Sequence, residues 1–298
     1  MHRLLPYVIC GLVLAPQPAR AECAARFEGE LRAGGEEYDP FEAVDFRRRQ
    51  TLTVRNVGTE ACDLVIAFHR QPKEGRLGQQ ISYRIEDASG QSLLTDRTAF
   101  SSSSQTLTLR DVAPTKAASA DYYLVLPRGQ SASPGVYHDD IVELALYARG
   151  GSAVSDGREL EVRPLAVVQS VKASVNINIA GGGLHTTLGF DELVTGKERT
   201  VAVQTRSNNS YNLRLRSENG SVLKLVSDEE DGSARIPYSL RVNAQPVSLG
   251  SAITLRRAAP QLGAGQESHL LTFRIEDAAD RRAGLYRDVI TVEISVAP

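Results

Sequence analysis

The fold class is decided by one stretch near the end of the chain, Ile290-Thr291-Val292-Glu293-Ile294-Ser295-Val296. Apolar and polar residues alternate along it, so in an extended strand one set of side chains faces a core and the other faces water. A second run has the same period of two and carries Val175, Ile177 and Ile179 on one face. This alternation is typical of antiparallel strands with one buried face.

Short clusters of turn-forming residues separate such runs, at residues 33–35, 101–104 and 181–183. No stretch keeps an apolar period of 3.6 residues with helix caps over several turns. Many short strands at this spacing indicate a sandwich or a barrel. We therefore expect an all-β protein built from antiparallel β-sandwiches.

The two halves of the chain repeat each other. The segment Ser133–Leu144 reads like Arg282–Glu293, and their glycines and tyrosines stand 149 residues apart. At the same offset, Thr51–Val54 matches Thr200–Val203 and Cys62–Leu64 matches Tyr211–Leu213. A looser match pairs Ile81–Ile85 with Ile236–Leu240. This predicts two tandem copies of one immunoglobulin-like fold, over residues 22–165 and 166–298.

The chain begins with the pattern of an export signal. A short positive start is followed by the apolar run Leu4–Leu14 and by Ala19-Arg20-Ala21, a small-x-small cleavage pattern. We expect residues 1–21 to be a signal peptide that is removed before Glu22. The apolar run is too short to cross a bilayer, and no later stretch approaches the necessary ~20 apolar residues, so we expect no membrane span.

The charge balance excludes one class of partner. The chain has 34 basic and 36 acidic residues, and loss of Arg3 and Arg20 with the signal leaves a small net negative charge. Nucleic-acid-binding domains usually carry a clustered basic excess instead. We expect no binding to nucleic acid.

Cys23 and Cys62 remain once Cys10 is removed with the signal. An even pair of cysteines in an oxidising compartment favours a disulfide bond. The alternative is a pair of free buried thiols.

No catalytic or metal-binding constellation stands out. The histidines are widely spaced, and the sequence has no HExxH motif, nucleophile elbow or phosphate-binding loop. The acidic segment Asp228–Gly232 could attract calcium, but its glycine is out of register for an EF-hand loop, which favours a solvated loop. We expect a protein that is not an enzyme and has no cofactor.

Several short motifs carry a family resemblance. They are Tyr38-Asp39-Pro40, the strand that starts at Cys62, the segment Ile236-Pro237-Tyr238, and the two turns Pro134–Asp139 and Ala283–Asp288. Together they resemble the spore coat protein U domain family, which includes the pilins and tip subunits of archaic chaperone–usher pili. The second half departs from the pattern, because it has no cysteine and its Gly189-Phe190-Asp191 matches only loosely.

The resemblance implies an incomplete second sandwich. Pilins of this family lack their final strand and are completed by an extended segment from a neighbour. The implied donor-strand groove has Val175, Ile177 and Ile179 on one wall and Ile290, Val292, Ile294 and Val296 on the other. About five uncovered apolar positions would be worth roughly 8–15 kcal/mol, as much as the stability of a whole domain. The alternative is that all seven belong to the core of a complete sandwich.

The resemblance also implies partners and a location. They are a periplasmic chaperone, an outer-membrane usher and a neighbouring pilin, with transit through the periplasm to a pilus on the cell surface. Because Cys23 follows the predicted cleavage site by one residue, we expect no donor segment and hence a tip subunit acting in adhesion or biofilm formation. Its first half, completed by Leu160–Val168, would be the adhesive domain. The alternative is a secreted carbohydrate- or protein-binding module with two complete sandwiches.

The repeated turns are expected to hold the fold rather than bind a ligand. Their shared positions are Gly135, Tyr137 and Asp139 in the first half and Gly284, Tyr286 and Asp288 in the second. In immunoglobulin-like sandwiches, a tyrosine near a strand corner often hydrogen-bonds back to the chain. We expect the same role for both tyrosines.

Overall fold

The structure is a computed structural model that describes residues 23–78, 80–97, 105–149, 157–227, 234–249, 253–260 and 263–298. The elements in these ranges are all β-strands, which confirms the predicted all-β class. The predicted signal peptide and the acidic segment Asp228–Gly232 lie outside the described residues. Within the described ranges, no helix has the length and apolar character needed to cross a membrane.

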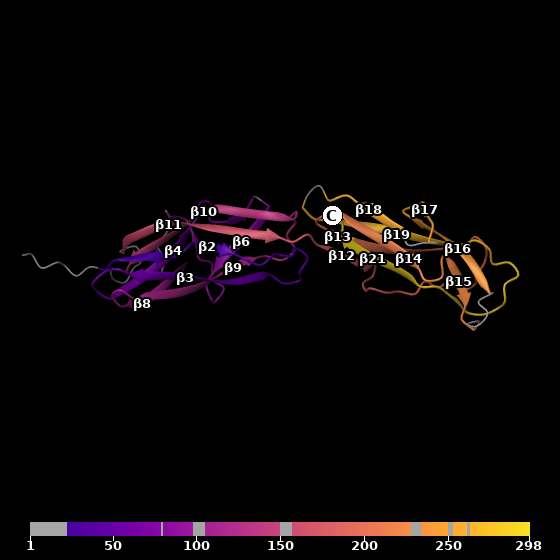
Figure 1. Ribbon diagram of the computed structural model, residues 1–298, viewed down its shortest axis with the longest axis horizontal. Coiled ribbons are helices and arrows are strands. Elements are labelled where there is room, and N and C mark those ends of the chain that lie inside the picture. Colours follow the sequence, from indigo (N-terminus) through magenta and orange to yellow (C-terminus); the bar gives the residue numbers. More distant parts are fainter. Residues whose placement is uncertain are drawn as a thin grey trace, which may run out of the picture.

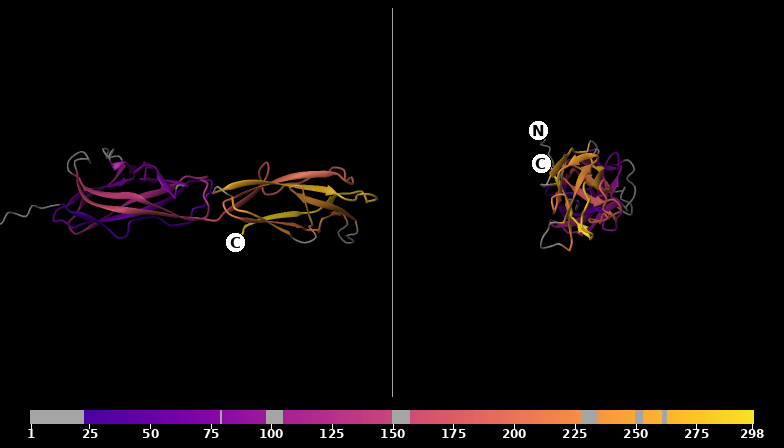
Figure 2. Two further views of the ribbon diagram at one scale, coloured as in Figure 1. Left: turned by 90° about the horizontal axis from the view of Figure 1, so that it is seen from above. Right: turned by 90° about the vertical axis from the view of Figure 1, so that its right-hand side faces the viewer.

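Two elongated β-sandwiches stand end to end (Figure 1). The view from above shows the same tandem arrangement, and in the view along the long axis the two sandwiches overlap (Figure 2). Each sandwich has its own apolar core: the first extends from Ala25 to Val171, and the second from Val203 to Ile275. The chain therefore folds as two units in series, as its internal repeat predicts.

Two sheets face each other in the first sandwich. One has the order β1 (Ala25–Glu28), β3 (Phe46–Asn56), β9 (Ala117–Leu126), β6 (Ile81–Glu86) and β5 (Gly75–Leu77). The other has the order β2 (Arg32–Gly34), β11 (Arg158–Val171), β10 (Gly135–Ala148), β4 (Cys62–His69) and β7 (Leu94–Thr95), and β8 (Thr106–Val112) also pairs with β4.

Strand β11 is the last strand of the first sandwich. It runs antiparallel to β10 along its length and parallel to β2 on its other side. It contains the segment Leu160–Val168, which was expected to complete this half. The expected division between residues 165 and 166 falls inside this strand. Because Val167 and Val171 belong to the first core, the first sandwich extends to Val171.

The second sandwich repeats this plan with fewer strands. Its larger sheet has the order β12 (Val175–Ile179), β13 (Glu198–Ser207), β19 (Gly265–Ile275), β16 (Arg235–Val242), β15 (Val222–Leu225) and β20 (Tyr286–Arg287), and β17 (Gln245–Val247) also pairs with β16. Its smaller sheet has the order β18 (Ile253–Arg257), β14 (Tyr211–Ser217) and β21 (Ile290–Val296).

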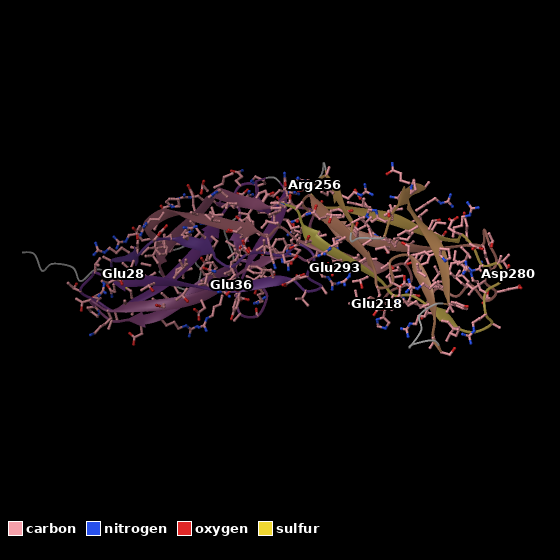
Figure 3. The ribbon with its side chains drawn as sticks, turned by 45° about the vertical axis from the view of Figure 1, so that its right-hand side comes forward. Glu28, Glu36, Glu218, Arg256, Asp280 and Glu293 are labelled. Carbon is pink, nitrogen blue, oxygen red and sulfur yellow. A yellow bond between two sulfur atoms is a disulfide. The ribbon has the colours of Figure 1, made fainter. Side chains whose placement is uncertain are left out.

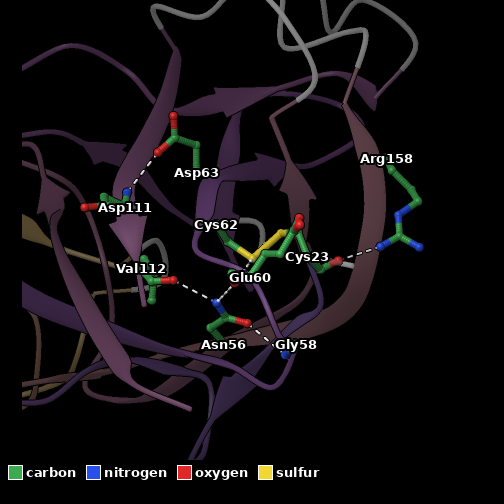
Figure 4. The surroundings of a disulfide bond; sticks show 9 residues. All are labelled: Cys23, Asn56, Gly58, Glu60, Cys62, Asp63, Asp111, Val112 and Arg158. Carbon is green, nitrogen blue, oxygen red and sulfur yellow. Dashed lines mark hydrogen bonds between the residues drawn. A yellow bond between two sulfur atoms is a disulfide. The ribbon is translucent and has the colours of Figure 1, made fainter. Parts of the chain in front are cut away.

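A disulfide bond joins Cys23 to Cys62, as predicted, with 5.5 Å between their Cα atoms. Cys23 lies just before β1 and Cys62 begins β4, so the bond links the two sheets of the first sandwich. Beside it, the amide nitrogen of Asn56 donates to the backbone oxygens of Glu60 and Val112, each at 2.7 Å (Figure 4). The disulfide therefore ties the end of the sandwich that lies away from the second unit.

Candidate functional site

The most distinctive feature of the second sandwich is the free edge of β21. This strand pairs with β14 along its whole length, and no other described strand pairs with it. Two hydrogen bonds, from Ala297 N to Ser210 O (2.9 Å) and from Glu218 N to Val289 O (2.9 Å), show which residues along β21 bond to β14. Because bonding alternates in an antiparallel pair, the backbone groups that point away from β14 are those of Ile290, Val292, Ile294 and Val296.

The equivalent strand of the first sandwich has both edges covered. Strand β10 lies between β4 and β11 and pairs with each of them. Its inward side chains Val142, Leu144 and Leu146 are 0% exposed. The two sandwiches therefore differ at one strand, since among the described residues of the second half nothing occupies the place that β11 takes in the first.

The apolar side chains of the predicted groove are only half-buried. This holds for Val175, Ile177 and Ile179 of β12 and for Ile290, Val292, Ile294 and Val296 of β21. Strands β12 and β21 belong to different sheets and approach each other at the sandwich edge. Five of the seven residues pack against the second core: Val175, Ile177, Ile290, Val292 and Ile294. Of the other two, Val296 lines a cavity beside Val175 at the junction with the first sandwich, and Ile179 ends β12.

The outer face of β21 is polar. Glu293, labelled in Figure 3, lies between Val292 and Ile294 and is exposed. Its carboxylate lies 3.7 Å from the guanidinium of Arg214 on β14. The strand thus has a charged outer face, a half-buried apolar inner face and an unpaired backbone edge.

The repeated turns have the same geometry in both halves. Gly135 and Gly284 have φ values of 147° and 156°, a region that favours glycine. The Tyr137 hydroxyl donates to the backbone oxygen of Ser133 at 2.8 Å, and the Tyr286 hydroxyl donates to that of Arg282 at 2.9 Å. Each tyrosine thus ties its turn to the residue four positions earlier.

The repeated aspartates accept hydrogen bonds from a tyrosine of the facing sheet. Asp139 Oδ2 accepts from Tyr83 at 2.8 Å and from Nε of Arg70 at 2.7 Å. The Arg70 and Asp139 side chains are only 5% and 1% exposed, so this ion pair is buried. Burial, reinforced by the neighbouring carboxylate, raises the pKa of Tyr83 above its usual value.

Asp288 is the centre of a similar network without an arginine. Its Oδ2 accepts from Tyr238 and from Ser217, each at 2.6 Å. Its Oδ1 accepts from the backbone N–H of Asn219 at 3.0 Å and from that of Val289 at 2.8 Å. The sequence repeat contains both the aspartates and the tyrosines Tyr83 and Tyr238, but it does not show that they bond to each other.

Two buried histidines lie in polar clusters. His269 is 1% exposed, and its Nε2 lies 2.9 Å from the Tyr211 hydroxyl, which donates to Glu267 at 2.7 Å. Burial lowers the pKa of His269 and raises that of Tyr211 to about 12. In the first sandwich, His69 lies near Tyr147 and Thr95, and burial lowers its pKa as well.

The structure offers no obvious site for a metal. Among the side chains that it describes, no group of three or more His, Cys, Asp or Glu residues is placed to hold an ion. In the part of the chain that the structure describes, four buried polar atoms have no hydrogen-bond partner, and they are dispersed: Gln169 Oε1, Ser174 Oγ, Arg257 Nε and His269 Nδ1.

The junction between the sandwiches depends on a residue that the sequence reasoning did not single out. Asn208 is 1% exposed, and its amide nitrogen donates to the backbone oxygens of Ala132 (3.2 Å) and Lys172 (2.8 Å). Its Oδ1 accepts from the backbone N–H of Ser174 at 2.8 Å. Nearby, Ser131 Oγ accepts from the backbone N–H of Ala264 at 2.8 Å. These bonds join the two units at their facing ends.

Comparison with known proteins shows the fold. No family model matches the chain, so its resemblance to the spore coat protein U domain stays a prediction, and no curated protein matches it. The chain is similar to one in the pre-assembly complex of the chaperone CsuC and the tip adhesion subunit CsuE from archaic chaperone–usher Csu pili of Acinetobacter baumannii. The TM-score is 0.50 at 16% identity, over 92% of this chain and 99% of that one.

A second similar structure is a mutant of the adhesin CfaE from CFA/I enterotoxigenic Escherichia coli. It has a TM-score of 0.38 and 11% identity, over 91% of this chain and 92% of that one. The likeness to the chain from the Csu complex agrees with the all-β, immunoglobulin-like fold described above.

Proposed function

We propose that this chain is a structural and adhesive subunit of a chaperone–usher pilus, and that its second sandwich is completed by an extended segment from another chain. The observation that carries the proposal is the contrast between the free edge of β21 and the covered edge of β10. The first half supplies its own covering strand, β11, so it serves as an internal template for the completed state.

The template predicts the direction of the inserted strand. Since β11 runs antiparallel to β10, we expect the incoming segment to run antiparallel to β21. Strand β21 ends at the junction, where the C-terminus lies in Figures 1 and 2. The segment would therefore begin at the junction and leave at the far end of the second sandwich. If the segment precedes the first domain of its own protein, as an N-terminal donor strand would, that domain would lie there. This leaves the first sandwich at the outer end and supports a tip position.

The groove also specifies the chemistry of the segment. Backbone pairing would satisfy the outward groups of Ile290, Val292, Ile294 and Val296, and alternate apolar side chains would cover the half-buried inner face. Completing the burial of the seven groove residues would stabilise the sandwich by roughly 5–10 kcal/mol, about half of full burial for each. This is a large part of the stability of a typical domain.

The proposed partners follow from this incomplete state. A periplasmic chaperone would cover the free edge before assembly, an outer-membrane usher would direct assembly, and a neighbouring pilin would supply the final strand. The fold likeness to a chain of a chaperone–tip subunit complex supports this assignment. The chain would then act at the cell surface, in attachment and biofilm formation, and without catalysis.

The test is to supply the absent strand within the same chain. In this fusion, a flexible glycine–serine linker after Pro298 leads into a second copy of residues 158–171. The added strand then follows β21 as β11 follows β10. We expect the unfolding free energy of the second sandwich to rise by at least ~5 kcal/mol. In the control fusion, the added strand carries the substitutions Leu165→Asp and Val167→Asp. Equal stability of the two fusions and the unmodified chain would contradict the proposal.

A further inference from the structure

We propose that the first sandwich forms the junction end of the acceptor groove, and that its Phe41 contacts the first apolar residue of the inserted strand. This inference rests on the proposed function, and it adds that strand insertion involves both sandwiches. A groove built by the second sandwich alone would make no contact with the adhesive domain.

The cavity at the junction supports this assignment. Val175 begins β12 and Val296 ends β21, so these residues are the junction ends of the two groove walls. The cavity that they line is also lined by Asp39, Phe41 and Glu42 of the first sandwich. The remaining lining comes from the connecting residues 172–174 and from Asn176. The groove therefore continues into a space with a wall made by the first unit.

Residues of both sandwiches contact Phe41 or the segment that carries it. The backbone N–H of Phe41 donates to Asp39 Oδ1 at 2.9 Å. The preceding Tyr38 is 1% exposed, and its hydroxyl donates to the backbone oxygen of Pro127 at 2.9 Å. From the second sandwich, the guanidinium of Arg206 lies 4.7 Å from the centre of the Phe41 ring. The Phe41 ring thus has a neighbour from the second sandwich before any strand arrives, and it remains half-buried.

Ser174 provides a second, independent observation. It lines the same cavity and is 7% exposed, and its Oγ has no hydrogen-bond partner among the residues described. A buried hydroxyl without a partner is costly, so a small shift that turns this Oγ toward the cavity would let an entering polar group bond to it. An extended peptide brings such backbone groups together with its side chains.

The direction of the inserted strand decides which of its residues reaches the cavity at the junction. Because the segment would run antiparallel to β21, its N-terminal residues would lie at the junction. An apolar side chain there would pack between Phe41, Val175 and Val296. The charged groups of Asp39, Glu42 and Lys172 would remain at the rim, where water solvates them. The first sandwich would thereby contribute to the choice of the inserted segment and to its register.

The experiment compares two peptide probes with the exported full chain. One has the sequence of residues 158–171, and the other lacks its first three residues and so loses Leu160. We expect Phe41→Ala to weaken binding of the longer peptide about fivefold and to leave binding of the shorter one unchanged. Val57→Ala, an exposed apolar position at the disulfide end of the first sandwich, is the matched control and should change neither affinity.

The outcomes separate this inference from the proposed function. If both peptides bind and neither affinity depends on Phe41, the junction contact is wrong while strand completion stands. If neither peptide binds to any variant, strand completion by such a segment fails, and the junction contact fails with it. A loss confined to the longer peptide supports both.

Discussion

The hydroxyl of Tyr238 donates a 2.6 Å hydrogen bond to Oδ2 of Asp288, from a strand of one sheet to the segment that precedes β21. Tyr83 makes the same bond to Asp139 in the first sandwich, at 2.8 Å. These two pairs hold the closing strand of each half against the facing sheet. Strand β21, which forms one wall of the proposed groove, is therefore held in place by contacts within its own sandwich.

The two aspartates should differ in their importance for stability. Asp139→Asn would leave the buried Arg70 guanidinium without a counter-charge, so we expect a loss of about 3–5 kcal/mol in the first sandwich. Asp288→Asn removes no buried ion pair, and we expect only about 1 kcal/mol in the second. Chemical denaturation of the two variants measures this difference. Equal losses would show that the Arg70–Asp139 pair has no special role.

The disulfide should stabilise one sandwich only. The Cys23–Cys62 bond closes a loop with a sequence separation of 39 residues in the first half. Its removal in the double variant Cys23→Ala, Cys62→Ala should lower the stability of that half by about 4 kcal/mol. Calorimetry should show one transition shifted and the other unchanged. A shift of both transitions would mean that the sandwiches do not unfold independently.

The stability of the second sandwich should fall in mild acid. Burial lowers the pKa of His269 in the folded protein, whereas an unfolded histidine takes up a proton below about pH 6.5. The unfolded state then binds more protons, so stability is greatest above that pH and is lost as the pH falls toward the folded pKa, by at most ~1.4 kcal/mol per pH unit. Thermal unfolding between pH 5 and 8 measures it.

The charged groups near His269 act in opposite directions. Arg257 opposes its protonation and Glu267 favours it, while burial is the larger effect. His269→Gln should flatten the pH dependence of the second sandwich, and His185→Gln at an exposed loop should leave it as it was. An unchanged pH profile in His269→Gln would exclude this histidine as the cause.

Asn208 should govern the coupling between the two units. Asn208→Ala removes three side-chain hydrogen bonds at the junction, which should cost about 2–3 kcal/mol. The distance distribution between fluorophores on the two sandwiches should broaden as well. Asn209→Ala, at the neighbouring half-buried position, serves as the control. A distribution as narrow as that of the unmodified chain would show that other contacts hold the junction.

The local sequence was sufficient to predict much of this architecture. Alternation identified the strands around Val175 and Ile290, since a period of two has few other structural meanings. The repeat of Gly135 at Gly284 reflected a backbone conformation that glycine adopts without strain. The pairing of Cys23 with Cys62 was expected because only these two cysteines lie beyond the predicted signal peptide.

Other features depend on contacts that a single sequence does not reveal. The end of the first sandwich at Val171 is set by the pairing of β11 with β10, whereas a composition-based division fell six residues earlier. Arg70 has no counterpart in the repeat, so its ion pair with Asp139 could not be predicted from it. Asn208 acts through backbone oxygens of residues distant in sequence, and such partners leave no local pattern.

Amide hydrogen exchange along β21 tests directly whether the second edge of this strand is free. It would be measured in the isolated chain and in the fusion that carries the second copy of residues 158–171. We predict an alternation in the isolated chain: the amides of Thr291, Glu293 and Ser295, bonded to β14, are protected. Those of Ile290, Val292, Ile294 and Val296 exchange rapidly. In the fusion, both sets should be protected, as on both edges of β10. Uniform protection of β21 in the isolated monomer would mean that its second edge is already covered. The proposal that this edge accepts a strand from another chain would then be wrong.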